Sequence, residues 1–249
     1  MAASKRMRID QLLVQRGLAE SRTRAQALVM AGVVFSGESR IDKPGQQISP
    51  DAAINMRGRD HPWVSRGGLK LDHALQHFEI DVSDKIALDL GASTGGFTDV
   101  LLSRSAARVY AVDVGHGQLA WSLRQDERVV VLEKTNVRTL DAALVPDPPE
   151  VIVGDLSFIS LTVGLPAALA LAAPGAVLVV LIKPQFEAGA DQVGKAGVVR
   201  DRAVHDQVCE SIRSWLSDES GWTVLGITDS PVTGAAGNRE FLIAASKPA

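Results

Sequence analysis

Residues 88–102 read LDLGASTGGFTDVLL, and this stretch decides the fold class of the chain. An apolar strand is expected over residues 86–91, followed by a glycine turn and a helix over residues 96–104. Further strands are expected at 108–115, 129–136, 150–158, 176–184, 222–230 and 241–248, with a helix at 201–217. This alternation predicts an α/β fold with a doubly wound, mostly parallel sheet. The last two strands are expected to pair like a hairpin, with the final strand as an antiparallel edge.

The glycine turn restricts the class of ligand. Its spacing is G-x-x-x-G-G over Gly91–Gly96, whereas a dinucleotide site needs G-x-G-x-x-G and a P-loop needs a following lysine. Asp113, at the end of the next strand, is placed to accept hydrogen bonds from ribose hydroxyls, and Asn136 and Phe158 are placed to contact adenine. A ligand with ribose and adenine but without phosphate fits, which predicts S-adenosylmethionine. A purely structural strand–helix turn is the alternative.

Bulk composition excludes several classes of protein. The chain has 249 residues, 46% of them hydrophobic and 22% charged, and its single cysteine, Cys209, allows neither a disulfide framework nor a cysteine metal cluster. The five histidines show no metal-ligand spacing, so no metal is expected. The basic, polar first ten residues suggest no signal peptide, and we expect a cytoplasmic protein. Residues 156–182 carry no charge, but Pro174-Gly175 interrupts them, so a helix, a turn and a strand are expected rather than a membrane span.

Charge divides the chain into a basic and an acidic part. Residues 1–70 hold 12 Lys and Arg against 6 Asp and Glu, and residues 71–249 hold 14 against 23. A basic module on an acidic body predicts a polyanionic partner.

The basic part of the chain has its own pattern of elements. Residues 8–30 suggest two short helices, the second capped by Ser21, before a β-rich stretch with a turn at Lys43-Pro44-Gly45. We place the first domain at 1–59, a linker at 60–64 and the second domain at 65–249.

The N-terminal module resembles a known RNA-binding domain. Residues 12–37, LLVQRGLAESRTRAQALVMAGVVFSG, followed by KPG, resemble the S4 domain, a small α+β module. The resemblance implies binding to structured RNA through phosphate and minor-groove contacts. The residues expected to contact RNA are Arg6, Arg8, Arg16, Arg22, Arg24, Lys43 and, near the second domain, Arg66.

Four charged residues stand at the ends of apolar segments of the second domain. Asp155 and Lys183 each follow an apolar strand, Glu240 opens the last strand, and Lys70 lies where the domain begins. Each alone is explained as a strand-end ion-pairing residue. Because the carboxyl ends of parallel strands meet at one edge and an antiparallel strand begins there, we expect Asp155, Lys183 and Glu240 to converge beside the glycine turn.

Five motifs connect the second domain with a family. SRGGLKL, DLGASTGGFTDVLL, GDLSFISL, IKPQFEAG and GNREFL, in this order after an S4 domain, resemble the TlyA/haemolysin A family over essentially the whole chain. The resemblance implies a Rossmann-like, FtsJ-type methyltransferase that uses S-adenosylmethionine to methylate a cytidine ribose 2′-hydroxyl in 16S and/or 23S ribosomal RNA. Ribosomal RNA or ribosomal subunits are then the partners, without a membrane, and the oligomeric state is left open. A membrane-active haemolysin and an RNA-binding protein without catalysis are the alternatives.

The resemblance also implies roles for individual residues. Lys70, Asp155, Lys183 and Glu240 correspond to the catalytic tetrad, with Lys183 either the base or a positioning group. The residues expected to bind the cofactor are Asp89, Gly91, Ala92, Ser93, Thr94, Gly95, Gly96, Phe97, Asp113, Val114, Asn136, Val137, Asp155, Leu156 and Phe158.

Overall fold

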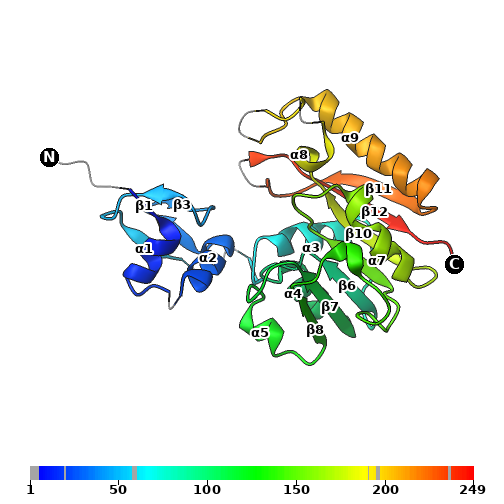
Figure 1. Ribbon diagram of the computed structural model, residues 1–249, viewed down its shortest axis with the longest axis horizontal. Coiled ribbons are helices and arrows are strands. Elements are labelled where there is room, and N and C mark those ends of the chain that lie inside the picture. The colour runs from blue at the N-terminus through cyan, green and yellow to red at the C-terminus, as the bar shows by residue number, and fades with distance from the viewer. Residues whose placement is uncertain (1–5, 20, 58–60, 190, 195–196, 235–236) are drawn as a thin grey trace. The chain divides into compact units, whose positions relative to one another are not determined.

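The computed structural model describes residues 6–19, 21–57, 61–189, 191–194, 197–234 and 237–249. The chain forms two compact units, Met1–Arg66 and Gly67–Ala249. Figure 1 shows a small α+β unit and a larger unit built around one sheet.

The first unit is a pair of helices with short strands. Its elements are β1 (Met7–Arg8), α1 (Ile9–Gln15), α2 (Arg22–Met30), β2 (Val34–Ser36), β3 (Ser39–Arg40), β4 (Gln47–Ile48) and β5 (Ile54–Met56). The side chain of Ser21 accepts a hydrogen bond from the Arg24 backbone N–H and caps α2, as predicted. Leu12, Leu13 and Val29 are buried between the helices and strands, so a small apolar core holds this unit together.

The second unit alternates strands and helices. Its elements are α3 (Gly67–His77), β6 (Ile86–Leu90), α4 (Gly96–Ser103), β7 (Arg108–Asp113), α5 (Trp121–Arg124), β8 (Val129–Glu133), the 3₁₀ turn η1 (Val137–Thr139), β9 (Val151–Gly154), α6 (Leu161–Gly164), α7 (Pro166–Leu171), β10 (Val177–Ile182), α8 (Pro184–Glu187), α9 (Arg202–Ser214), the π-helical turn η2 (Trp215–Glu219), β11 (Thr223–Asp229) and β12 (Phe241–Ser246). All the strands and the long helix expected in this part of the chain form.

The sheet has the order β11-β12-β10-β9-β6-β7-β8. Strands β10, β9, β6, β7 and β8 are parallel, and β12 is antiparallel to both β10 and β11. The expected pairing of the last two strands is therefore confirmed. The expectation that the final strand forms the edge is wrong, because β12 inserts between β10 and β11 and leaves β11 at the edge.

The two faces of the sheet are covered by different helices. On one face Leu88 and Leu90 belong to a core with the apolar side chains of α6, α7 and α9. Successive side chains of a strand alternate between faces, so Asp89 points to the other face, where Thr98 of α4 hydrogen-bonds it. Helix α3 packs against α4. The carboxyl edge of the sheet thus has α3 and α4 on one side and α8 and α9 on the other.

The uncharged run 156–182 forms part of this core. It folds into α6, α7 and β10, with Gly175 in the left-handed region at the turn before β10. Within the ranges that the structure describes, none of the helices has the length and apolar character needed to span a bilayer.

Gly91 is required where β6 meets the turn. Its φ is +81°, and a Cβ at this position would lie 2.9 Å from the backbone oxygen of Asp155. Gly221 has a similar φ of +70° but open space around it. We therefore expect Gly91→Ala to destabilise the protein more than Gly221→Ala, which serves as the control. The control should lose about 1–2 kcal/mol from left-handed backbone alone, and urea unfolding of both variants measures the difference. Equal losses in the two variants would contradict a close approach at Gly91.

Candidate active site and RNA-binding surface

The glycine turn is fastened to the end of β7 by Asp113. One carboxylate oxygen of Asp113 accepts the Ser93 N–H at 2.8 Å, and the other accepts the Gly115 N–H at 2.7 Å. Gly95, with φ +95°, is the N-cap of α4. Each carboxylate oxygen can accept more than one hydrogen bond, so Asp113 keeps acceptor capacity for ribose hydroxyls.

Asp89 is a fully buried carboxyl beside this turn. Its Oδ2 accepts the Thr98 hydroxyl at 2.6 Å, while its Oδ1 accepts no hydrogen bond from the described residues. Burial raises the pKa of Asp89 to about 7, although Thr98 acts in the opposite direction. An unsatisfied buried acceptor is costly, and a donor group on a ligand in the turn would relieve it. Asp89 and Asp113 together fit a ligand that is rich in donors and has a ribose.

The other residues predicted to bind the cofactor differ in their exposure and in their structural roles. Val114 is 68% exposed and Phe158 is 90% exposed, so both offer apolar surface near strand ends. Asn136 caps η1 by accepting the Arg138 N–H, which gives it a structural task as well. The side chains of Ala92, Thr94, Phe97, Val137 and Leu156 are buried. These five can therefore shape the turn and the strand ends but offer little side-chain surface.

The four charged residues converge as predicted. The Lys70 ammonium lies 2.7 Å from Glu240 Oε2 and 3.3 Å from Asp155 Oδ2. The Lys183 ammonium lies 2.5 Å from Asp155 Oδ1. Asp155 therefore bridges the two lysines. We call these four residues the charged cluster.

The electrostatics of the charged cluster favour the charged forms of Lys70 and Asp155. Lys70, Lys183 and Glu240 are 8%, 6% and 3% exposed. Burial lowers the pKa of Lys70, but Asp155 and Glu240 outweigh it, so that pKa is raised overall. Burial likewise raises the pKa of Asp155, but the two lysines lower it to about 2. The two ammonium groups are thus matched by two carboxylates.

Sequence reasoning missed one member of this arrangement. The Lys183 ammonium donates a hydrogen bond to the Ser157 hydroxyl at 2.7 Å. Ser157 follows Asp155 by two residues in GDLSF, and this spacing was the available signal. Phe186 of α8 lies beside the lysine, 6.0 Å from its ammonium, and its ring packs against Phe158 at 5.0 Å.

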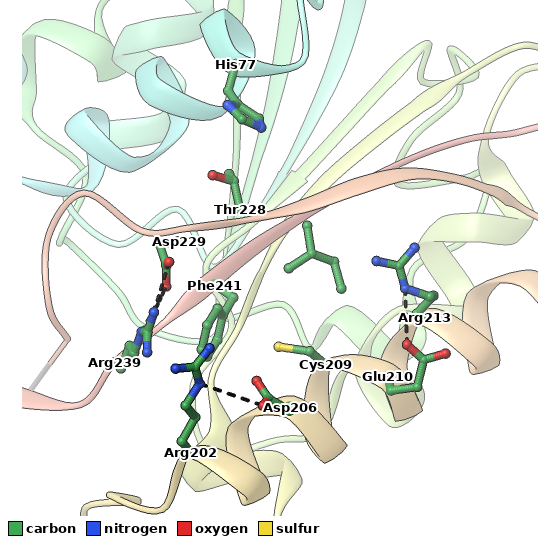
Figure 2. Close-up of a pocket in the computed structure, with 11 residues that line it drawn as sticks. His77, Arg202, Asp206, Cys209, Glu210, Arg213, Thr228, Asp229, Arg239 and Phe241 are labelled. Carbon is green, nitrogen blue, oxygen red and sulfur yellow. Dashed lines mark hydrogen bonds and ion pairs between the residues drawn. The ribbon is translucent and has the colours of Figure 1, made fainter.

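A groove of about 450 Å³ lies elsewhere on the second unit (Figure 2). It is lined by His77, Arg202, Asp206, Cys209, Glu210, Arg213, Ile227, Thr228, Asp229, Arg239 and Phe241. Its three arginines form ion pairs with its three acidic side chains. Glu240, although between Arg239 and Phe241 in sequence, pairs with Lys70 instead. The groove is thus separate from the charged cluster, and its balanced charge does not favour an anionic ligand.

In the first unit a buried carboxylate organises two of the predicted RNA-binding arginines. Asp10 is fully buried and accepts hydrogen bonds from Arg8 at 3.0 and 2.8 Å, Arg22 at 3.0 Å and Gln26 at 3.0 Å. The hydrogen bond from Arg8 is the main reason that the pKa of Asp10 is lowered. Arg8 and Arg22 stay partly exposed while Asp10 holds them.

The remaining predicted RNA-binding residues differ in their surroundings. Arg16 donates to the backbone oxygens of Pro50 and Ala52 and so ties α1 to the strands. Arg66 pairs with Asp42 at 3.1 Å. Arg6, Arg24 and Lys43 are exposed.

Comparison with known proteins agrees with this fold and identifies its two domains. Residues 63–247 match the model of the FtsJ-like methyltransferase family, and residues 7–54 match the S4 domain. The 16S/23S rRNA (cytidine-2′-O)-methyltransferase TlyA of Mycobacterium tuberculosis is 46% identical over 96% of this chain and 90% of its own. Hemolysin A of Brachyspira hyodysenteriae is 40% identical over 95% of this chain and 98% of its own. A solved structure named as a hemolysin from Streptococcus thermophilus has a TM-score of 0.76 and 43% identity, covering 99% of this chain and 90% of that chain.

The fold and the family matches thus define an S4-containing methyltransferase of the FtsJ-like class. The chain belongs to the TlyA/haemolysin A family. The predicted resemblance, fold class and enzyme class are confirmed, and S-adenosylmethionine is the cofactor of this class.

The raised pKa of Asp89 predicts a pH dependence of stability. The folded protein keeps a proton on Asp89 up to about pH 7, whereas the unfolded chain releases it near pH 4. As the pH rises from about 4 to about 7, the Asp89 carboxyl therefore lowers the free energy of unfolding. Asp89→Asn removes the effect, so the variant should gain roughly 3 kcal/mol relative to the parent between pH 5 and pH 8. Urea unfolding at several pH values measures this gain, and a gain that shrinks as the pH rises would contradict the assignment.

Proposed function

We propose that this protein transfers a methyl group from S-adenosylmethionine to the 2′-hydroxyl of a cytidine in ribosomal RNA. The supporting observation is the convergence of Lys70, Asp155, Lys183 and Glu240 at the carboxyl edge of the sheet that carries the glycine turn. The substrate is inferred from relatives, since the Mycobacterium tuberculosis protein is named as a cytidine-2′-O-methyltransferase of 16S and 23S rRNA.

The glycine turn and Asp113 would hold the cofactor, with Asp113 accepting hydrogen bonds from its ribose and Asp89 accepting a donor at its free Oδ1. S-adenosylmethionine supplies an electrophilic methyl group when bound. Gly91 and Gly95 let the backbone turn tightly at the strand end, so the cofactor can lie next to the charged cluster.

Two roles for Lys183 fit this geometry. A ribose hydroxyl loses its proton as its oxygen bonds to the methyl carbon, so a neutral Lys183 amine can accept that proton. Alternatively, the Lys183 ammonium stays charged and orients the hydroxyl, and alignment supplies the rate. In either role Asp155 and Ser157 fix the nitrogen from two sides. Lys70 and Glu240 in turn balance the charge of Asp155 and hold it in place.

The first unit would supply RNA affinity rather than chemistry. Arg6, Arg24 and Lys43 are exposed cations, and Asp10 presents Arg8 and Arg22 as a fixed pair. Charged contacts of this kind bind phosphates with strong salt dependence. Ribosomal subunits are the proposed partners, and such a substrate implies that the protein acts in the cytoplasm.

The proposed function is tested with purified ribosomal subunits that lack the modification. Labelled S-adenosylmethionine is supplied with each subunit, and the methylated nucleotide is mapped by nuclease digestion and mass spectrometry. Label in a 2′-O-methylcytidine of ribosomal RNA is expected. Label only on a base, or none in either subunit, would contradict the proposal.

Replacing Lys183 tests its place in the chemistry. Lys183→Ala should abolish methyl transfer while cofactor binding, measured by titration calorimetry, survives. Lys85→Ala is the matched control, because Lys85 lies at the amino end of β6, at the opposite edge of the sheet. A variant that keeps more than about a tenth of the rate, equivalent to roughly 1.4 kcal/mol of barrier, would remove Lys183 from the essential set.

Substitutions of two arginines in the first unit should separate effects on RNA binding from effects on folding stability. Arg24 is exposed, so Arg24→Ala should weaken RNA binding and reduce the salt slope by about one without loss of stability. Arg16 bonds two backbone oxygens, so Arg16→Ala should lower the unfolding midpoint. Binding at several salt concentrations and thermal unfolding measure both effects. An unchanged salt slope in Arg24→Ala would exclude Arg24 from the interface.

A further inference from the structure

Gly234 and Asn238 are the described ends of the turn before β12, and Gly234 lies directly beside Glu240. The Gly234 N–H donates to the Asn238 backbone oxygen at 2.9 Å, which joins these two ends. A Cβ on Gly234 would lie 1.9 Å from Glu240 Oε1 and 2.5 Å from its carboxyl carbon. The missing side chain of Gly234 therefore leaves the space that the Glu240 carboxylate fills.

The turn cannot easily move away from the carboxylate. Asn238 is buried, and its side chain donates to the Gly197 oxygen at 2.9 Å and accepts the Val199 N–H at 3.2 Å. The Val199 oxygen in turn lies 3.1 Å from His205 Nε2 on α9. These contacts anchor the turn to the segment ahead of α9.

Glu240 is then the part that would yield to a larger residue at position 234. The clashing atoms are at the far end of its flexible side chain, so the carboxylate rather than the backbone would move. That rotation would break the 2.7 Å contact between Glu240 Oε2 and Lys70. Lys70 would keep only Asp155, at 3.3 Å, as an ion-pair partner within the charged cluster.

We propose that Gly234 is a positioning residue of the methyl-transfer site, which sets the place of the Glu240 carboxylate and through it that of Lys70 and Asp155. This inference rests on the proposed function. Gly234 touches neither of the reacting groups, and it acts by leaving room for Glu240 under a turn that Asn238 anchors.

Gly234→Ala is the direct test. We expect kcat for methyl transfer to fall at least about tenfold, equivalent to roughly 1.4 kcal/mol of barrier. The Kd for S-adenosylmethionine should stay within about twofold of the parent, whereas the melting temperature should fall, because the displaced carboxylate breaks the buried ion pair between Glu240 and Lys70. Thr233→Ala, at an exposed neighbour in the same turn, is the matched control and should keep the parent rate. A Gly234→Ala variant with the parent kcat would overturn the proposal.

A double variant separates positioning from a general disturbance of the turn. Glu240→Ala removes the carboxyl group and the Cγ that lie next to residue 234. If Gly234 acts through Glu240, Gly234→Ala in the Glu240→Ala background should reduce the residual kcat no further. Two losses that multiply would show independent actions and overturn the proposal.

A crystal structure of Gly234→Ala distinguishes failure of this inference from failure of the proposed function. The Glu240 carboxylate should be displaced from Lys70, whether or not the parent protein methylates ribosomal RNA. A carboxylate still paired with Lys70 in that structure would refute the positioning role. Absence of methyl transfer by the parent protein, with the carboxylate displaced in the variant, would refute only the proposed function.

Discussion

The bridge from Asp155 to Lys70 and Lys183 is the interaction on which the site depends. Each carboxylate oxygen receives a different ammonium group, at 3.3 and 2.5 Å, in a largely buried setting. Without Asp155, two buried ammonium groups would face each other with only Glu240 to balance them. Breaking a buried ion pair by removing one partner typically costs about 3–5 kcal/mol. The four charged groups therefore depend on one another for stability, and Glu240 balances the second ammonium charge by pairing with Lys70.

Sheet topology explains why residues so far apart in sequence meet. Asp155 and Lys183 follow β9 and β10, which are parallel neighbours, so both project from the same edge. Strand β12 runs antiparallel to β10 and therefore begins at that edge, which brings in Glu240. Helix α3, packed against α4, supplies Lys70. The glycine turn after β6 opens at this same edge, next to β9. The position of the site thus follows from strand direction and order.

Much of this arrangement was predictable because it depends on short-range pattern and on one rule of topology. Alternating apolar runs identified the strands, and charges at the strand ends identified Asp155, Lys183 and Glu240, whereas the role of Lys70 came from the family resemblance. Strand order was not predictable in the same way. The continuous apolar run FLIAA at 241–245 fits an inner strand, but the pairing partners of a strand lie far away in sequence, and β12 proved to lie between β10 and β11. The sequence also does not show which side chains form hydrogen bonds or ion pairs with one another.

The arginines of the first unit illustrate that limit. Their positive charge is evident in the sequence, but the sequence does not show that Asp10 holds Arg8 and Arg22, whereas Arg16 bonds backbone oxygens. Ser157 and Gly234 were missed for a related reason. A hydroxyl and a missing side chain acquire meaning only when Lys183 and Glu240 are seen beside them.

The central claim, that the charged cluster faces the reacting methyl group, is tested most directly by a crystal structure of this protein with S-adenosylhomocysteine. The account predicts adenosine between the glycine turn and Asp113, with the sulfur directed toward Lys183. A ligand bound with its sulfur turned away from the charged cluster, or bound outside the glycine turn, would contradict it.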